Sequence, residues 1–324
     1  MKRMTKESLY QGRIFKDYLL NQEYLDSEEG QRTLNEHMLL GWLANKQEIQ
    51  DSTLQPIAKK EFKRQWHLNQ TYQEILVELA PKFVEANIRP VLLKGITFLD
   101  KMYKDLGDRS MSDIDMFVNP NELNTCVLLL ESAGFTKSSS QKWRANSHKL
   151  ELIRTSEGIE TVIELHTKLF YHVEEPKWNF KCFSIEPYLK LESEDEFLYL
   201  CTHVGFQHSF MKLFWLLDLH FILSGLTNID EKKVINLAKA HKVYSSFSMT
   251  LYILKTYFGT ELNTEFNQVQ EKLSGLKKSL LSVSYLMNPK SSMLQYLSIK
   301  HLCKDSFSEA INYNLGWIKD RFSS

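Results

Sequence analysis

Residues 113–118 alternate carboxylates with large apolar side chains, and this two-residue period constrains the fold more than any other feature of the sequence. Successive side chains of a β-strand point to opposite faces, so the pattern predicts a core strand with one apolar face. Asp113 and Asp115 then share the other face and point into one pocket. Acidic residues two positions apart are common by chance, but charges on a core strand need a compensating interaction. We therefore expect this pair to carry chemistry.

The surrounding residues 86–190 have the pattern of a mixed α/β unit. Short apolar runs predict a strand at Val91–Leu93, and alternation predicts an antiparallel pair at 149–154 and 160–166, with the turn near Gly158. Helical spacing predicts helices over 96–103 and 122–133. These elements would place the acidic pair inside a sheet.

The two flanking regions have helical spacing instead. Apolar residues such as Met38, Leu39, Trp42 and Leu43 recur at helical intervals, and no proline precedes Pro56. Residues after 191 predict further helices, among them one over 208–223, with the last two within 293–322. The predicted fold class is α+β, with a helical N-terminal region 1–85 that packs on the core, an α/β core 86–190 and a helical C-terminal domain 191–324. A length of 324 residues agrees with more than one domain.

Composition excludes several classes of protein. Lysine plus arginine is 40 and aspartate plus glutamate is 40, so a net charge of zero argues against broad electrostatic capture of nucleic acid. The four cysteines form no CxxC pair, which argues against a zinc ribbon or a disulfide framework. The most apolar stretch, 213–226, is interrupted by Asp218 and His220 and is too short to span a bilayer. With no secretory signal visible, we expect a cytoplasmic protein without a membrane partner.

Two further elements can complete a site around the acidic pair. Lys94 and Gly95 follow the predicted strand 91–93, where glycine lets a backbone approach a phosphate and lysine adds a positive charge. Glu164 and His166 share one face of the predicted strand 160–166, so Glu164 can supply a third carboxylate. The alternative for Lys94 and Gly95 is an ordinary turn without a ligand, and the alternative for 160–166 is an edge strand with one solvated face. Neighbouring carboxylates repel one another, and a divalent cation such as Mg²⁺ relieves that repulsion.

In this order, Leu-Leu-Lys-Gly (92–95), Arg-x-x-Ser-Asp-Ile-Asp (109–115) and Ile-Glu-Leu-His (163–166) resemble the nucleotidyltransferase superfamily typified by DNA polymerase beta. More closely, they resemble a bacterial branch of uncharacterised nucleotidyltransferases. The resemblance implies a polymerase beta-like mixed sheet flanked by helices. It implies that Asp113, Asp115 and Glu164 bind Mg²⁺ or Mn²⁺ and carry catalysis. Residues expected to contact the nucleotide are Lys94, Gly95, Arg109 and Ser112.

The implied reaction transfers a nucleoside monophosphate from a nucleoside triphosphate to a hydroxyl-bearing acceptor and releases pyrophosphate. A small molecule, a sugar, a peptide or a protein would fit as the acceptor, and nucleic acid is not expected. We place His166 and Asp218 on the acceptor side, with a structural ion pair or hydrogen bond as the alternative for Asp218.

One departure from the superfamily pattern leaves a second function open. Gly95 is followed by Ile96, where the superfamily usually has Gly-Ser or Gly-Gly. A catalytically degenerate nucleotidyltransferase-fold binding module is therefore the first alternative. The second is a glycosyltransferase with an Asp-x-Asp metal pair, which the helical pattern before Val91 disfavours because such enzymes need a Rossmann-like sheet there.

Overall fold

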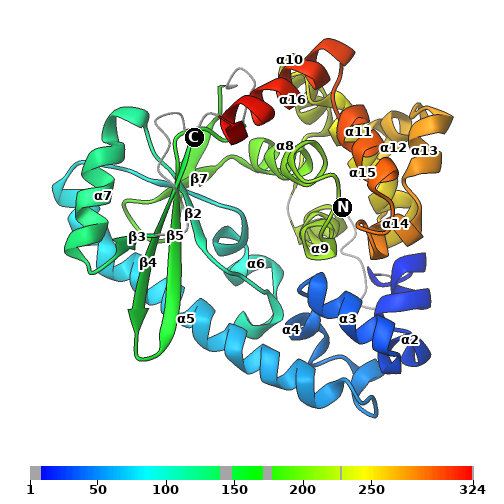
Figure 1. Cartoon of the computed structure of the whole chain (residues 1–324), viewed down its shortest axis with the longest axis horizontal. Coiled ribbons are helices and arrows are strands. Elements are labelled where there is room, and N and C mark those ends of the chain that lie inside the picture. The colour runs from blue at the N-terminus through cyan, green and yellow to red at the C-terminus, as the bar shows by residue number, and fades with distance from the viewer. Residues whose placement is uncertain (1–8, 139–147, 171–176, 227, 323–324) are drawn as a thin grey trace. The chain divides into compact units, whose positions relative to one another are not determined.

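The computed structural model describes residues 9–138, 148–170, 177–226 and 228–322 (Figure 1). The first eight residues of the predicted helical lead-in lie outside this range. The chain divides into two compact units. Residues 63–192 with 312–324 contain the sheet, and residues 1–62 with 193–311 form a helical unit. The long helix α5 (Gln55–Glu85) begins in the helical unit and ends in the sheet unit.

The sheet unit contains a mixed sheet of seven described strands in the order β3-β4-β5-β2-β1-β7-β6. Its two parallel pairs are β2 with β5 and β1 with β7, and the other neighbours are antiparallel. The predicted α+β class is confirmed. The strands are β1 (Val91–Leu93), β2 (Ile114–Phe117), β3 (Thr136–Lys137), β4 (Lys149–Ser156), β5 (Ile159–His166), β6 (Phe180–Cys182) and β7 (Leu189–Leu191).

A hydrophobic core packs against one face of this sheet. The long helix α5 contributes apolar residues at helical spacing, from Leu68 through Tyr72 and Leu79 to Phe83. Helix α7 (Leu123–Ser132) adds Cys126, Val127 and Leu130 to the same core. Alternate residues of the strands fill the rest, among them Ile114, Met116, Leu150, Leu152, Ile163 and Leu165. By the strand period, the residues between them point to the opposite face.

Short capped helices build the helical unit. Serine and asparagine side chains accept backbone N–H bonds at several helix starts, as Ser27 does at α3 and Ser274 at α13. No helix in the described part of the chain is long and apolar enough to cross a bilayer. The α-helices of this unit not yet given are α2 (Gln22–Asp26), α3 (Glu28–Glu36), α4 (Leu40–Leu43), α8 (Ser193–Thr202), α9 (Leu213–Phe221), α10 (Glu231–Ala240), α11 (Tyr244–Ile253), α12 (Thr264–Glu271), α13 (Gly275–Leu280), α14 (Val283–Met287) and α15 (Met293–Leu302). Helix α16 (Phe307–Phe322) begins in this unit and its residues from 312 on are grouped with the sheet unit, which also contains α6 (Leu99–Met102).

Two predicted helices differ from the structure. The helix expected over 96–103 is a 3-10 turn at Lys94–Thr97 followed by the four-residue α6. The helix expected over 208–223 begins only at Leu213, because Ser209 and Phe210 adopt positive φ angles of 50° and 60°. Such backbone angles cannot continue a right-handed helix.

Candidate active site

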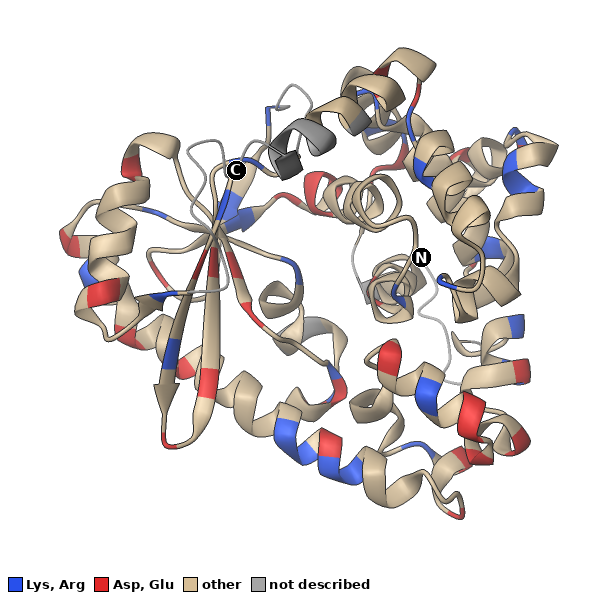
Figure 2. Cartoon of the chain, in the orientation of Figure 1, with Lys and Arg blue, Asp and Glu red and all other residues tan. Residues whose placement is uncertain are grey.

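Two central strands bring the predicted carboxylates together. Strands β2 and β5 are parallel neighbours, and their register sets Asp115 opposite Glu164. Asp115 and Glu164 are buried, and both lie on the face opposite the hydrophobic core. Asp113 directly precedes β2 and is two positions from Asp115. Figure 2 shows acidic positions within the central strands and charges of both signs along α5.

Basic groups surround the two buried carboxylates. Lys94 Nζ lies 2.7 Å from Asp115 Oδ1. His166, also on β5, places Nε2 at 2.8 Å from the same oxygen and at 3.4 Å from Glu164 Oε2. Lys149 forms an ion pair with Glu164. Each buried acidic group therefore has a cationic partner, which offsets the cost of burying its charge.

The two aspartates differ in protonation. Burial raises the pKa of Asp113 to about 7, and the nearby charges of Asp115 and Glu164 add to the rise. Burial also acts to raise the pKa of Asp115, but the Lys94 ammonium and His166 outweigh it and hold that pKa below its usual value. The pKa of His166 is raised because its hydrogen bonds to Asp115 and Glu164 outweigh its burial. Asp115 is thus ionised at neutral pH, whereas Asp113 is ionised only in part.

Lys149 is a member of the site that the sequence analysis missed. It lies on β4, directly opposite His166 of β5. The hairpin turn between these strands is Glu157-Gly158, with φ angles of 51° and 78°, flanked by the pair Ser156 and Ile159. Two residues with positive φ are typical of a type I′ turn, whose loop length fixes the register of a hairpin. A type I′ turn at Glu157-Gly158, recognised in the sequence, would have fixed the strand register and so predicted that Lys149 lies near Glu164.

One face of α5 holds the loop that leads into Asp113. Gln65 Oε1 accepts the backbone N–H of Met111 at 3.0 Å. The Asn69 amide donates to the carbonyls of Leu106 and Arg109, each at 2.7 Å. The Tyr72 hydroxyl donates to the Ser112 carbonyl at 2.6 Å. These three residues lie three or four positions apart, so their side chains line up on one face of the helix and fix the loop.

The turn after β1 differs from an open phosphate cradle. Gly95 is buried in the 3-10 turn, and a Cβ there would lie 2.9 Å from Met111 Cγ. A larger residue at this position would force the Met111 side chain to shift. Lys94 has a φ of 54°, and its carbonyl accepts the Thr97 hydroxyl at 2.7 Å. The Thr97 hydroxyl therefore donates within the turn itself.

The remaining predicted residues form no described contact with the carboxylates of Asp115 and Glu164. Arg109 is only 3 % exposed, and its guanidinium donates to the Ser110 carbonyl. Ser112 is exposed, one position before Asp113. Asp218 is buried on α9, in the helical unit rather than in the sheet unit. The structure thus brings together Lys94, Asp113, Asp115, Glu164 and His166, with Lys149 added.

The donor atoms of the site suit a divalent cation. One ligand atom each from Asp115, Glu164 and His166 lies within 4.8 Å of the others. Carboxylate oxygens are the ligands that Mg²⁺ and Mn²⁺ prefer, and Asp113 stands two positions from Asp115 on the same strand face. His166 already uses Nε2 on both carboxylates, so it fits better as the group that orients them.

Comparison with known proteins gives one match. A search of curated proteins and a search of solved structures each found no match. The sequence model of a family described as "Uncharacterised nucleotidyltransferase" matches residues 25–259. This range contains all the carboxylates and basic groups of the site and well over half of the 324 residues. The chain therefore belongs to this uncharacterised nucleotidyltransferase family.

Proposed function

We propose that this protein is a metal-dependent enzyme that transfers a nucleoside monophosphate from a nucleoside triphosphate to a hydroxyl-bearing acceptor and releases pyrophosphate. One observation carries the proposal: Asp115 and Glu164 lie opposite each other on two parallel central strands, buried on the face away from the core. Asp113, on the same face as Asp115, adds a third carboxylate. Buried carboxylates that lie close together despite their mutual electrostatic repulsion are typical of a metal site for phosphoryl transfer.

Asp113, Asp115 and Glu164 would hold Mg²⁺ or Mn²⁺, which supplies charge stabilisation to the phosphate oxygens when it is bound. The acceptor hydroxyl transfers its proton to the Glu164 carboxylate, and its oxygen forms a bond to the α-phosphorus. The bond from that phosphorus to the bridging oxygen breaks, and pyrophosphate leaves. His166 keeps the carboxylates of Asp115 and Glu164 in place through Nε2.

Lys94 and Lys149 supply the positive charge of the site. In the structure their ammonium groups pair with Asp115 and Glu164. Each ammonium sits on a flexible four-carbon stem, so it can turn towards a phosphate once other charge neutralises the carboxylates. We propose this exchange as the way in which Lys94 contacts the nucleotide. The hydroxyl that the Gly95-Ile96 turn lacks is then replaced by an ammonium group.

Nucleotide binding by thermal shift tests the proposal. ATP, GTP, CTP and UTP are each added with and without Mg²⁺ to the wild type and to the Asp113→Asn, Asp115→Asn double variant. A ligand at about 100 times its dissociation constant stabilises the fold by about 2.7 kcal/mol, so we expect a magnesium-dependent rise in Tm for at least one nucleotide. The double variant should lose this rise.

Glu160→Gln is the matched control, because Glu160 lies on β5 on the same side as Glu164 but is exposed and four positions away. It should keep the full magnesium-dependent shift. If the double variant kept the shift as well, the nucleotide would bind elsewhere. If no nucleotide shifted the wild type, the degenerate binding module would become the better account, with the filled turn at Gly95 as its cause.

A further inference from the structure

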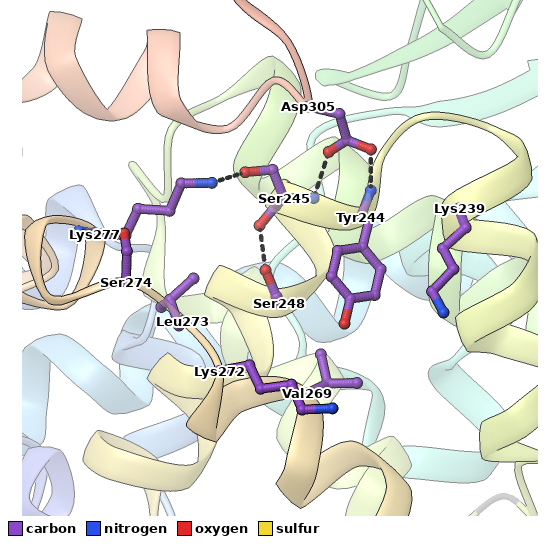
Figure 3. Close-up of a pocket in the computed structure, with 10 residues that line it drawn as sticks. All are labelled: Lys239, Tyr244, Ser245, Ser248, Val269, Lys272, Leu273, Ser274, Lys277 and Asp305. Carbon is purple, nitrogen blue, oxygen red and sulfur yellow. Dashed lines mark hydrogen bonds between the residues drawn. The ribbon is translucent and has the colours of Figure 1, made fainter.

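The helical unit contains a cavity of about 640 Å³. This volume lies within the range of small-molecule pockets in proteins, about 300–1,000 Å³. Figure 3 shows the residues that line it, which come from α10, α11, the end of α12, α13 and the segment between α15 and α16. All of them belong to the helical unit, and none is a residue of the carboxylate site.

Hydrogen-bond donors dominate the polar lining of this cavity. Lys239, Lys272 and Lys277 line it, and among described residues none of the three forms an ion pair with a carboxylate. Lys277 donates to the Ser245 hydroxyl, which leaves donor positions of its ammonium for a ligand. The Tyr244 hydroxyl has no hydrogen-bond partner among the residues that the structure describes. In Figure 3, Lys277 reaches Ser245 on one side of the Tyr244 ring, and Lys239 lies on the other.

Among the described residues that line the cavity, Asp305 is the only carboxylate, and it is already engaged. Asp305 accepts the backbone N–H groups of Tyr244 at 3.0 Å and Ser245 at 2.5 Å, so it caps the start of α11. Three ammonium groups against one carboxylate leave the lining with an excess of two positive charges. Burial lowers the pKa of Lys277, which an anion in the cavity would reverse.

Part of the cavity lining is apolar. Val269 and Leu273 are buried there, and the Tyr244 ring adds a flat face. Ser245 and Ser248 are each 4 % exposed, and the Ser248 hydroxyl donates to the Ser245 carbonyl at 3.0 Å. A single phosphate would fill only a small part of this volume, so the cavity has room for an organic body beside the anionic group.

From these contacts we infer that the cavity of the helical unit binds a small organic phosphate monoester. The phosphate lies among Lys239, Lys272 and Lys277, which act as point charges and donors. The organic body packs on Val269, Leu273 and the Tyr244 ring. This second site needs no metal and does not depend on the carboxylates of the sheet unit.

Isothermal titration calorimetry tests the inference with two probes, inorganic phosphate and phenyl phosphate, in buffer with EDTA at constant ionic strength. Phenyl phosphate should bind more tightly than inorganic phosphate because its ring contacts the apolar walls. Loss of one charge-assisted donor in Lys277→Gln should weaken binding of phenyl phosphate about tenfold. Lys278→Gln is the matched control: it removes the same charge from the next position of α13, but Lys278 does not line the cavity and donates to the Glu271 carbonyl.

Two further variants keep the test decisive. Lys272→Glu reverses a charge at an exposed position, so it should abolish binding while leaving the Tm unchanged. The Asp113→Asn, Asp115→Asn double variant should bind phenyl phosphate as the wild type does, which separates this site from the nucleotide site. Absence of saturable binding to the wild type, or equal weakening in Lys277→Gln and Lys278→Gln, would overturn the inference.

Discussion

Asp113 and Asp115 differ in what surrounds them, although they are two positions apart on one strand face. Asp115 has Lys94 and His166 against its carboxylate, at 2.7 Å and 2.8 Å. Asp113 forms no ion pair among the described residues and lies in the field of Asp115 and Glu164. The two residues therefore have opposite effects on the stability of the metal-free protein.

Substitution of each aspartate by asparagine should reveal this difference. Asp113→Asn removes a repelled carboxylate whose pKa is raised to about 7, so at pH 8 without metal we expect it to stabilise the fold by about 1 kcal/mol or more. Asp115→Asn leaves Lys94 without its buried partner and should destabilise the fold by about 3 kcal/mol. Urea unfolding in EDTA measures both values. Destabilisation of similar size in both variants would contradict this account.

Most of this residue-scale arrangement could be predicted from the sequence. The two-residue alternation predicted that Asp113 shares a strand face with Asp115, and Glu164 with His166. The family resemblance, carried by the order of the motifs, predicted that the two strands lie close together. The partners of the carboxylates could not be predicted in this way. Lys94 directly follows Leu93, which the register of β1 and β2 sets opposite Asp115, and its φ of 54° ends the strand there; the place of Lys149 depends on the register of a hairpin.

At the scale of elements, α5 positions the loop that carries the candidate site. Tyr72→Phe tests this role because it removes the hydroxyl that donates to Ser112, immediately before Asp113. We expect a loss of about 1 kcal/mol in stability, together with weaker magnesium-dependent nucleotide binding. Thermal shift with and without nucleotide measures both effects.

Tyr188→Phe is the control for this change. Tyr188 is also buried in the sheet unit, and its hydroxyl donates to the Leu76 carbonyl at 2.9 Å, away from the loop. Its loss should cost similar stability and leave nucleotide binding unchanged. Equal loss of binding in both variants would mean that the hydroxyl of Tyr72 contributes only general stability.

Strands with strong alternation or an uninterrupted apolar run were the predictable ones. The strand Val91–Leu93 is where the apolar run predicted it, and β4 and β5 extend the predicted pair by one or two residues. Strands β3, β6 and β7 have only two or three residues, too few for a two-residue period to appear, and each contains a lysine that interrupts any apolar run. Their places depend on pairing with distant strands, as β7 pairs with β1, and a local pattern does not contain that information.

For the molecule as a whole, two buried histidines of the helical unit predict acid sensitivity. His37 Nε2 lies 2.9 Å from the Met287 carbonyl, while its Nδ1 accepts the Leu213 N–H. His220 contacts the Leu9 carbonyl and the Thr260 hydroxyl. Burial lowers the pKa of both residues to about 4. Both rings are thus held neutral, with a carbonyl at one nitrogen and a donor at the other.

A depressed histidine pKa contributes stability that is complete above about 6.5 and is lost as pH falls towards 4, because the unfolded state then binds more protons. Each residue can contribute about 3 kcal/mol over this range. The two histidines make the free energy of unfolding fall between pH 7.5 and pH 5, whereas the raised pKa of Asp113 acts in the opposite direction over the same range. We therefore expect the fall to be larger in Asp113→Asn than in the wild type, and to shrink when His37→Leu is added to that variant. Adding His67→Gln instead, at an exposed position, should leave the fall unchanged. The same pH dependence with and without His37→Leu would contradict this prediction.

The division of the chain into units has a consequence for synthesis on the ribosome. The sheet unit is almost contiguous at residues 63–192, whereas the helical unit needs residues 1–62 and 193–311 together. Most of the sheet can therefore form while the later helices are still being translated. The helices within residues 1–62 pack with residues 193–311, which are synthesised only after the whole sheet unit. Contacts across so long an intervening segment form late because closing a long loop costs more entropy. Vectorial synthesis thus favours completion of the candidate active site before completion of the unit that begins the chain.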